Sequence, residues 1–149
     1  MTALLEVSGV SVTFDGFRAI NNLSFSHDAR LLASASSDGT AKIWHTGTAS
    51  PPITFSAGAS GLWCVAISHD QSRLAAAADG GRVHIWDVAR RLPVARLQQP
   101  NPSIALRLTF GPDDSWLGAA GNGWHHIWPA PHNEAAPRPT GEVHTPAGQ

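Results

Sequence analysis

The sequence is poor in charge and has a single cysteine. Charged side chains make up 14% of the 149 residues, and the formal net charge is −1. Electrostatic binding to nucleic acid or to an acidic membrane surface needs a basic patch, so this composition argues against both kinds of partner. Cys64 is the only cysteine, which rules out an internal disulfide and suits a reducing compartment.

Long apolar runs are also missing. No stretch approaches the roughly 18 consecutive apolar residues that a membrane helix requires. The opening residues, MTALLEVSGV, lack the basic part and the long apolar part of a secretory signal peptide. We therefore expect a soluble, cytoplasmic protein without membrane insertion. Its 42% of hydrophobic residues is an ordinary share for a domain with a core.

Common catalytic motifs are absent. Lys42 is the only lysine, and Ala41 stands before it. A phosphate-binding P-loop needs glycine at that place, so nucleotide hydrolysis of that kind is excluded. No G-x-S-x-G nucleophile elbow occurs, and no pair of carboxylates stands out as a general acid and base. We expect no enzyme activity and no cofactor.

Eight histidines raise the question of a metal site. His84 and His126 each stand two residues before a tryptophan, and His125 is next to the latter histidine. A zinc site needs three or four convergent ligands. Alternation along a strand sends His125 and His126 to opposite faces, so both cannot readily join one site. We interpret the histidines as surface or strand-packing residues and expect no metal.

What the sequence does contain is a repeat. Trp44, Trp86 and Trp128 are spaced by 42 residues, and each closes a similar phrase. Three further landmarks recur with nearly the same spacing: an apolar strand end, an aspartate three residues later and a leucine four residues after that. In chain order these landmarks are Phe25, Ile67 and Phe110, then Asp28, Asp70 and Asp113, then Leu32, Leu74 and Leu117. A period near 40 residues made of short strands indicates a propeller or a solenoid.

Each copy divides into short strands separated by turn signals. The expected first strands are 20–25, 62–68 and 104–110; the second are 31–36, 73–78 and 116–120; the third are 40–45, 82–87 and 124–128. Fourth strands are expected at 52–55 and 92–97, with no counterpart after Trp128. Small alanine and serine side chains in the second strands would let neighbouring sheets approach closely.

The turns between second and third strands carry the dipeptides Asp38-Gly39, Gly80-Gly81 and Asn122-Gly123. Such pairs tolerate positive φ at both residues, which predicts type I′ hairpins. Residues 129–149 are rich in proline and almost free of large apolar side chains, so we expect a disordered tail there.

These phrases resemble the WD-repeat β-propeller family over about residues 20–128. The Trp-Asp ending is complete only at Trp86-Asp87. The resemblance implies an all-β fold, a partial propeller of about three four-stranded antiparallel blades with the last lacking its outer strand. The implied repeats are 20–56, 57–98 and 99–128, preceded by an N-terminal β segment at 1–19.

In the resembled family a buried polar network joins a turn aspartate, a Ser or Thr, the repeated tryptophan and a histidine. The matching positions here are Ser36, Asp38, Trp44, Asp79, Trp86, Asn122 and Trp128. The network is incomplete, because Ala78 replaces a hydroxyl residue and the usual Gly-His pair is missing. Unpaired buried polar groups destabilise a fold by about 1–3 kcal/mol each.

A second resemblance concerns residues 4–25, which are similar to the opening strands of an ATP-binding-cassette transporter ATPase. It implies an adenine-stacking role for Phe14. The alternative is that this segment simply supplies two strands, LLEV and VSVTF, which could lend blade three its missing outer strand and so cap the propeller.

The repeat and the missing catalytic motifs together predict a non-catalytic scaffold that binds protein partners, as a fragment or truncated propeller. The alternatives are a remnant or fusion of the transporter ATPase, with residual or no nucleotide binding, and a non-functional gene fragment. Trp63 falls outside the repeated pattern near a loop end, which makes it a candidate anchor for a partner. Three blades leave open ends, so self-association to complete the ring is a further hypothesis.

Overall fold

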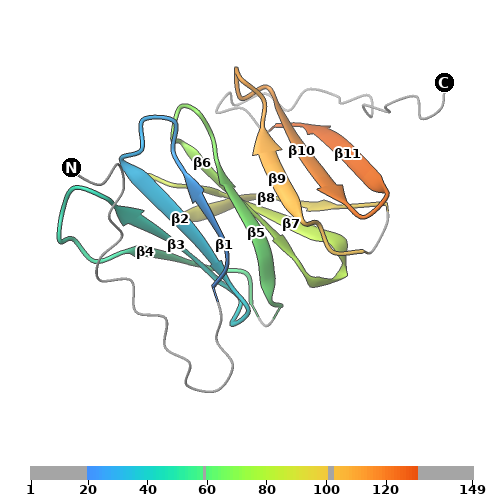
Figure 1. Cartoon of the computed structure of the whole chain (residues 1–149), viewed down its shortest axis with the longest axis horizontal. Coiled ribbons are helices and arrows are strands. Elements are labelled where there is room, and N and C mark those ends of the chain that lie inside the picture. Colours follow the sequence, from blue (N-terminus) through green and yellow to red (C-terminus); the bar gives the residue numbers. More distant parts are fainter. Residues whose placement is uncertain (1–19, 59, 101–102, 131–149) are drawn as a thin grey trace, which may run out of the picture.

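The computed structural model describes residues 20–58, 60–100 and 103–130, which form three antiparallel sheets (Figure 1). Phe14, the expected N-terminal segment 1–19 and residues 131–149 of the expected tail lie outside the described residues. No α-helix occurs in the described part of the chain, which holds a single 3-10 turn, η1 (Asp79–Gly81). We call the three sheets blades 1, 2 and 3.

Each blade is a meander in which consecutive strands pair. Blade 1 contains β1 (Ile20–Phe25), β2 (Leu31–Ser36), β3 (Thr40–His45) and β4 (Ile53–Ser56). Blade 2 contains β5 (Leu62–Ile67), β6 (Arg73–Ala78), β7 (Arg82–Asp87) and β8 (Leu92–Gln98). Blade 3 contains β9 (Arg107–Phe110), β10 (Trp116–Gly121) and β11 (Trp124–Pro129), with no fourth strand among the residues described. The predicted fold class is therefore confirmed.

The boundary between blade 3 and the expected tail lies slightly beyond Trp128. Pro129 pairs with Trp116 as the last residue of β11. Ala130 is buried, and its amide donates to the carbonyl of Ser115 at 3.0 Å. The blade therefore includes two residues that composition assigns to the tail.

Two of the three expected type I′ turns are wrong. Gly80 and Gly81 both have positive φ, as predicted. In blades 1 and 3 the glycine alone is left-handed, at Gly39 and Gly123, and neither Asp38 nor Asn122 is among the positive-φ residues. A non-glycine residue with positive φ carries a steric cost, so the second residue takes up the left-handed conformation alone.

Cross-strand register gives every blade two distinct faces. Pairing of Leu32 with Trp44, Leu74 with Trp86 and Leu117 with Trp128 places each repeated tryptophan on the same side of its sheet. We call this side the tryptophan face and the opposite side the far face. Residues alternate between the two faces along each strand.

Blade 2 is covered on both faces. Leu74, Ala76 and Trp86 of its tryptophan face share a core cluster with Ala33 and Ile43 of blade 1. On its far face, alanine and aliphatic residues share a second cluster with the tryptophan face of blade 3; the main members are Ala75, Ala77, Val83, Ile85, Leu108, Phe110 and Leu117. All six residues of β6 are buried, and small side chains there allow this two-sided packing, as expected.

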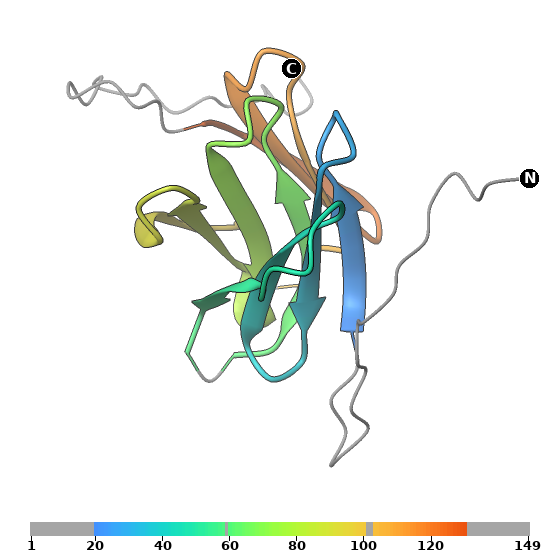
Figure 2. The same cartoon turned by 90° about the vertical axis from the view of Figure 1, so that its left-hand side faces the viewer.

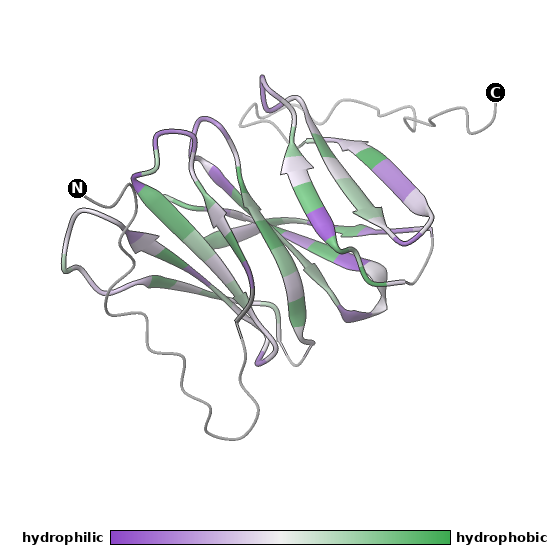
Figure 3. Ribbon diagram, viewed as in Figure 1, coloured by the Kyte–Doolittle hydropathy of each residue, from purple (hydrophilic) through white to green (hydrophobic). Residues whose placement is uncertain are grey.

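The first strands of the blades, β1, β5 and β9, lie side by side in chain order, so the blades follow one another like sectors of a fan (Figures 1 and 2). Hydrophobic residues lie along strands β2, β5 and β10, whereas hydrophilic residues gather in the loops (Figure 3). This arrangement brings the ends of the three first strands to a common axis.

Candidate functional site

A pocket of about 250 Å³ opens where the first strands of all three blades end. Its apolar walls are Phe25 of β1, Ile67 of β5 and Phe110 of β9. The polar groups around it come from Ser24 and Thr109 and from two histidines in the turns after β1 and β5, His27 and His69. No single blade could form this pocket, because each contributes one wall.

The two histidines stand together at the pocket. Their ring centroids are 5.6 Å apart with the rings tilted by 41°. They occupy equivalent repeat positions, and blade 3 has Pro112 there instead. The sequence repeat Ser-His-Asp therefore places two imidazoles at one end of the axis.

Asp114 of blade 3 contacts His69 of blade 2. Its Oδ1 accepts the backbone amide of His69 at 2.8 Å and lies 3.3 Å from His69 Nδ1. Its Oδ2 accepts the amide of Asp70 at 2.9 Å. The carboxylate thus joins the turn of blade 3 to the turn of blade 2.

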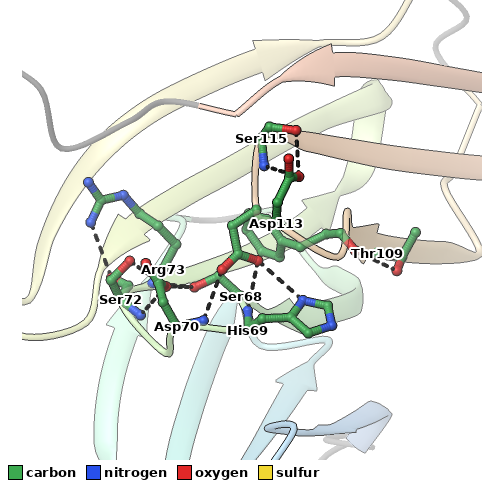
Figure 4. Close-up of polar contacts among 10 residues, drawn as sticks. Ser68, His69, Asp70, Ser72, Arg73, Thr109, Asp113 and Ser115 are labelled. Atoms are coloured by element: carbon green, nitrogen blue, oxygen red, sulfur yellow. Dashed lines mark hydrogen bonds and ion pairs between the residues drawn. The ribbon is translucent and has the colours of Figure 1, made fainter.

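The repeated aspartates organise the turns from which the histidines project. Asp70 Oδ1 accepts the amide and the hydroxyl of Ser72 at 2.9 and 2.7 Å, and Asp113 makes the same pair of bonds with Ser115 (Figure 4). In blade 1, a hydrogen bond from the Ser26 hydroxyl lowers the pKa of Asp28 to about 2. Burial alone would raise the pKa of Asp70, but bonds from Ser72 and Ser68 hold it below its usual range. The repeated aspartates therefore cap the turns that follow the first strands.

Trp63 and Asp79, which the sequence suggests for separate roles, are brought together at the opposite end of the axis. The Trp63 indole Nε1 donates to Asp79 Oδ1 at 2.5 Å, and Asp79 Oδ2 accepts the amide of Gly61 at 3.0 Å. The side chain of Trp63 remains 38% exposed at the start of β5. Asp79 therefore orients an exposed indole.

In blade 1 the residues expected in the polar network make different pairs. The Trp44 indole donates to Ser34 Oγ at 3.2 Å rather than to Ser36. Trp44 pairs with Leu32 near one end of the sheet, whereas Ser36 lies at the other end, where its hydroxyl accepts the Asp38 amide at 3.3 Å. Asp38 in turn accepts the Thr40 amide at 2.9 Å, which closes the β2–β3 turn.

The repeated tryptophans of blades 2 and 3 pack against histidine rings. Trp86 is buried and stacks on His84 with centroids 5.6 Å apart, and Trp128 meets His126 edge-on at 4.6 Å. Burial lowers the pKa of both His84 and His126. Asn122 is exposed in the β10–β11 turn, away from this packing.

The residues described hold no group of three or more side chains with metal-ligand chemistry. Cys64 is buried and its thiol lies 3.3 Å from the Ala105 carbonyl oxygen. Burial raises the pKa of this thiol to about 12, so it is not a nucleophile at neutral pH. In blade 2 Arg73 Nη1 meets Asp87 Oδ2 at 3.0 Å inside the fold, which makes the Asp of the complete Trp-Asp ending a structural partner.

Sequence reasoning missed Asp114 and the histidine pair. The sequence did hold a signal for Asp114, because this residue occupies the same repeat position as Ala29 and Gln71. In the structure all three residues lie in equivalent turns with φ near +60°. Side chains at this position in blades 2 and 3 reach back to the preceding turn; Gln71 bonds to Asp28 as Asp114 bonds to blade 2.

The family model described as "WD domain, G-beta repeat" matches residues 9–45 and 50–87, which together make up just over half of the chain. The chain belongs to the WD-repeat family. The matched segments end at His45 and Asp87, the residues that follow Trp44 and Trp86, so the tryptophan period marks true WD repeats. WD repeats generally mediate contacts between proteins and generally carry no catalysis. None of the curated proteins compared with the chain matches it.

The first matched WD repeat includes residues 9–25 of the segment that resembles a transporter ATPase. The ATPase resemblance and the role of Phe14 stay predictions. Within the described ranges, no helix is long and apolar enough to cross a membrane.

Proposed function

We propose that this WD-repeat chain is a non-catalytic scaffold that binds protein partners at the two ends of its axis. The observation that carries the proposal is the pocket of about 250 Å³ to which all three blades contribute. A concave site that places fixed polar groups beside aromatic and aliphatic residues suits the binding of a ligand side chain. Trp63, exposed and oriented by Asp79 at the other end, supplies a second anchor.

The chemistry of the pocket favours binding over catalysis. Histidine and aspartate side chains, His69 and Asp114, are paired there. A catalytic pair of this kind also needs a nucleophile within hydrogen-bond reach of the histidine. The hydroxyl of the nearby Thr109 donates to the Phe110 carbonyl at 3.2 Å instead. The single cysteine supports placing this activity in a reducing compartment such as the cytoplasm.

The test is capture of partners from an extract, followed by titration of one purified partner against three versions of the chain. We expect Trp63→Ala or Phe25→Ser to weaken binding at least about tenfold, because truncating a central anchor removes over 1 kcal/mol. Leu92→Ala, on an exposed outer strand of blade 2, is the matched control and should bind like the unchanged chain.

Two results would contradict the scaffold proposal. One is a purified partner whose affinity none of the pocket or Trp63 variants changes. The other is turnover of a nucleotide or ester substrate that His69→Ala abolishes. A broad, uncooperative thermal transition of the unchanged chain would instead favour a non-functional fragment.

A further inference from the structure

The turns that surround the pocket at the end of the first strands are acidic. Four aspartates and one arginine stand in these turns, which are residues 26–30, 68–72 and 111–115. The Ser26 hydroxyl and the Arg30 amide donate to the carboxylate of Asp28, so its pKa falls to about 2 and the group is ionised at neutral pH. The mouth of the pocket therefore has a negative potential.

The cations at this end of the blades leave that negative charge in excess. Arg30 approaches Asp28 at 3.7 Å, but its side chain is 84% exposed, so water screens the contact. Arg73 is buried in its pair with Asp87. Arg90 and Arg91 stand in the β7–β8 turn, on the outer side of blade 2 and two strands away from β5.

His69 offers the pocket a hydrogen-bond acceptor. Its Nδ1 lies 3.3 Å from Asp114 Oδ1. A carboxylate can only accept, so Nδ1 carries the proton of the neutral ring. The lone pair is then on Nε2, the ring nitrogen farther from Asp114. Because His69 lines the pocket and its side chain is 43% exposed, a ligand can reach this acceptor.

Other residues that line the pocket also suit a ligand that donates hydrogen bonds. The Thr109 hydroxyl gives its proton to the Phe110 carbonyl at 3.2 Å, which leaves lone pairs of its oxygen for a donor. The hydroxyl of Ser24 rotates freely enough to accept as well. Phe25, 38% exposed, adds an aromatic ring, and the face of such a ring attracts a cation.

We propose that the pocket takes a basic side chain of a protein partner. This inference rests on the proposed function and names the chemistry of the side chain that is bound. The cavity is the site, and the acidic turns decide the sign of the ligand's charge. A guanidinium or ammonium group donates hydrogen bonds and accepts none, which matches the acceptors on His69 and Thr109. Its apolar stem can lie along Phe25 and Ile67.

Other classes of side chain fit this pocket less well. A carboxylate would meet the acidic turns and the lone pair of His69, and charges of one sign repel each other. An apolar side chain would displace water from Ser24, Thr109 and His69 without offering them a hydrogen bond, which costs free energy at each group. A basic side chain avoids both penalties.

The experiment titrates the full-length chain with capped Gly-X-Gly peptides in which X is arginine, citrulline or glutamate. Citrulline keeps the shape of arginine without its charge and is the matched ligand control. NMR follows the ring Cε1 proton of His69, which is assigned by its loss in His69→Gln. We expect the citrulline peptide to bind at least about tenfold more weakly than the arginine peptide, because hydrogen bonds to a charged group are the stronger ones. The glutamate peptide should give no saturable shift.

Variants of the chain locate the binding site. Asp114→Asn removes the negative charge beside His69 and should weaken the arginine peptide at least about threefold. Asp38→Asn makes the same change of charge in the β2–β3 turn, at the other end of blade 1, and should leave binding unchanged. Phe25→Leu keeps an apolar wall without the aromatic ring and should weaken the arginine peptide about two- to fivefold. It changes a partly exposed residue, so it remains informative if Asp114→Asn fails to fold.

The inference would be overturned if the citrulline peptide bound as tightly as the arginine peptide, if the glutamate peptide bound more tightly, or if the arginine peptide gave no saturable shift. The proposed function fails separately. If Phe25→Ser weakens a purified partner but no arginine or lysine of that partner matters, the scaffold proposal stands and this inference is wrong. If neither Phe25→Ser nor Trp63→Ala changes the partner's affinity, the scaffold proposal is wrong, and the peptide titration still decides the ligand chemistry of the pocket.

Discussion

Blades 1 and 2 share strand order and register, yet their tryptophan faces have different surroundings. In blade 2 this face packs on blade 1, and its repeated tryptophan is buried. In blade 1 no preceding blade packs on the same face among the described residues, and Leu23 and Phe25 of the first strand are exposed, although Leu32 of the second strand is buried. The same repeat positions therefore lie in the core or at the surface, depending on whether a preceding blade packs on the tryptophan face.

The full Trp-Asp ending of a WD repeat occurs in the covered blade. Blade 2 has the full Trp-Asp ending, the buried Arg73–Asp87 pair and six buried residues in β6. At the position of Arg73, blade 1 has Leu31 and blade 3 has Trp116. The blade that is covered on both faces is thus also the one that keeps the full Trp-Asp ending and its buried ion pair.

The largest expected effect compares core residues of the two tryptophan faces. Leu74→Ala in blade 2 should lower the free energy of unfolding by about 3–4 kcal/mol, because a fully buried leucine leaves a cavity. Leu23→Ala in blade 1 should cost under about 1–2 kcal/mol, because this side chain is half-exposed. Urea denaturation followed by tryptophan fluorescence measures both. Equal losses would show that the two faces do not differ in burial.

The ion pair of blade 2 comes next. Arg73→Met leaves the buried Asp87 carboxylate without its partner and should cost about 2–3 kcal/mol. The double variant Arg73→Met with Asp87→Leu should recover most of that loss, because no buried charge remains. The same denaturation measurement applies. A double variant as unstable as the single one would assign the loss to packing rather than to charge.

A smaller effect tests the clamp between blades. Asp114→Ala removes bonds to the amides of His69 and Asp70 and should cost about 1–2 kcal/mol. Ala29→Asn, at the matching position of blade 1, should change stability by less than about 0.5 kcal/mol, because the described residues offer it no turn of a preceding blade to bind. If Asp114→Ala proved neutral in thermal unfolding, the contact between the blade 2 and blade 3 turns would contribute nothing to stability.

The smallest effect is a pH dependence near neutrality. Burial lowers the folded-state pKa of His84 and His126 below the unfolded value. Their contribution to stability is complete above the unfolded pKa, near 6.5, and falls as pH drops from there through the folded pKa. The melting temperature should therefore decline from pH 7.5 to pH 5.5, and less so in His84→Leu. A steeper decline in that variant than in the exposed-site control His45→Leu would contradict this sign.

Much of the fold could be predicted from the sequence because strand, turn and repeat signals are local. The tryptophan period, the aspartate turns and the alanines of residues 73–78 each specify short-range structure. The composition after Trp128 led us to expect no outer strand in blade 3, and none occurs there among the described residues. The predicted turn types at Asp38 and Asn122 were wrong, because one left-handed glycine is sufficient in each of these turns.

The functional sites were harder to predict because they depend on contacts between blades. His69 and Asp114 are 45 residues apart in sequence, and only the stacking of blades 2 and 3 brings them together. The choice of Ser34 over Ser36 as the partner of Trp44 depends on strand register, which dipeptide signals do not give. Trp63 could be suggested from its irregular position, but its bond to Asp79 required the folded β5 and β6.

The most direct test of the account is hydrogen exchange, followed by mass spectrometry, on the full-length chain. The central claim is that blade 2 is enclosed between blades 1 and 3. It predicts that amides of β6 exchange most slowly of all strands, with β2 and β10 faster and the edge strand β11 fastest. Exchange of β6 as fast as that of β11 would contradict the stacked arrangement of the three blades.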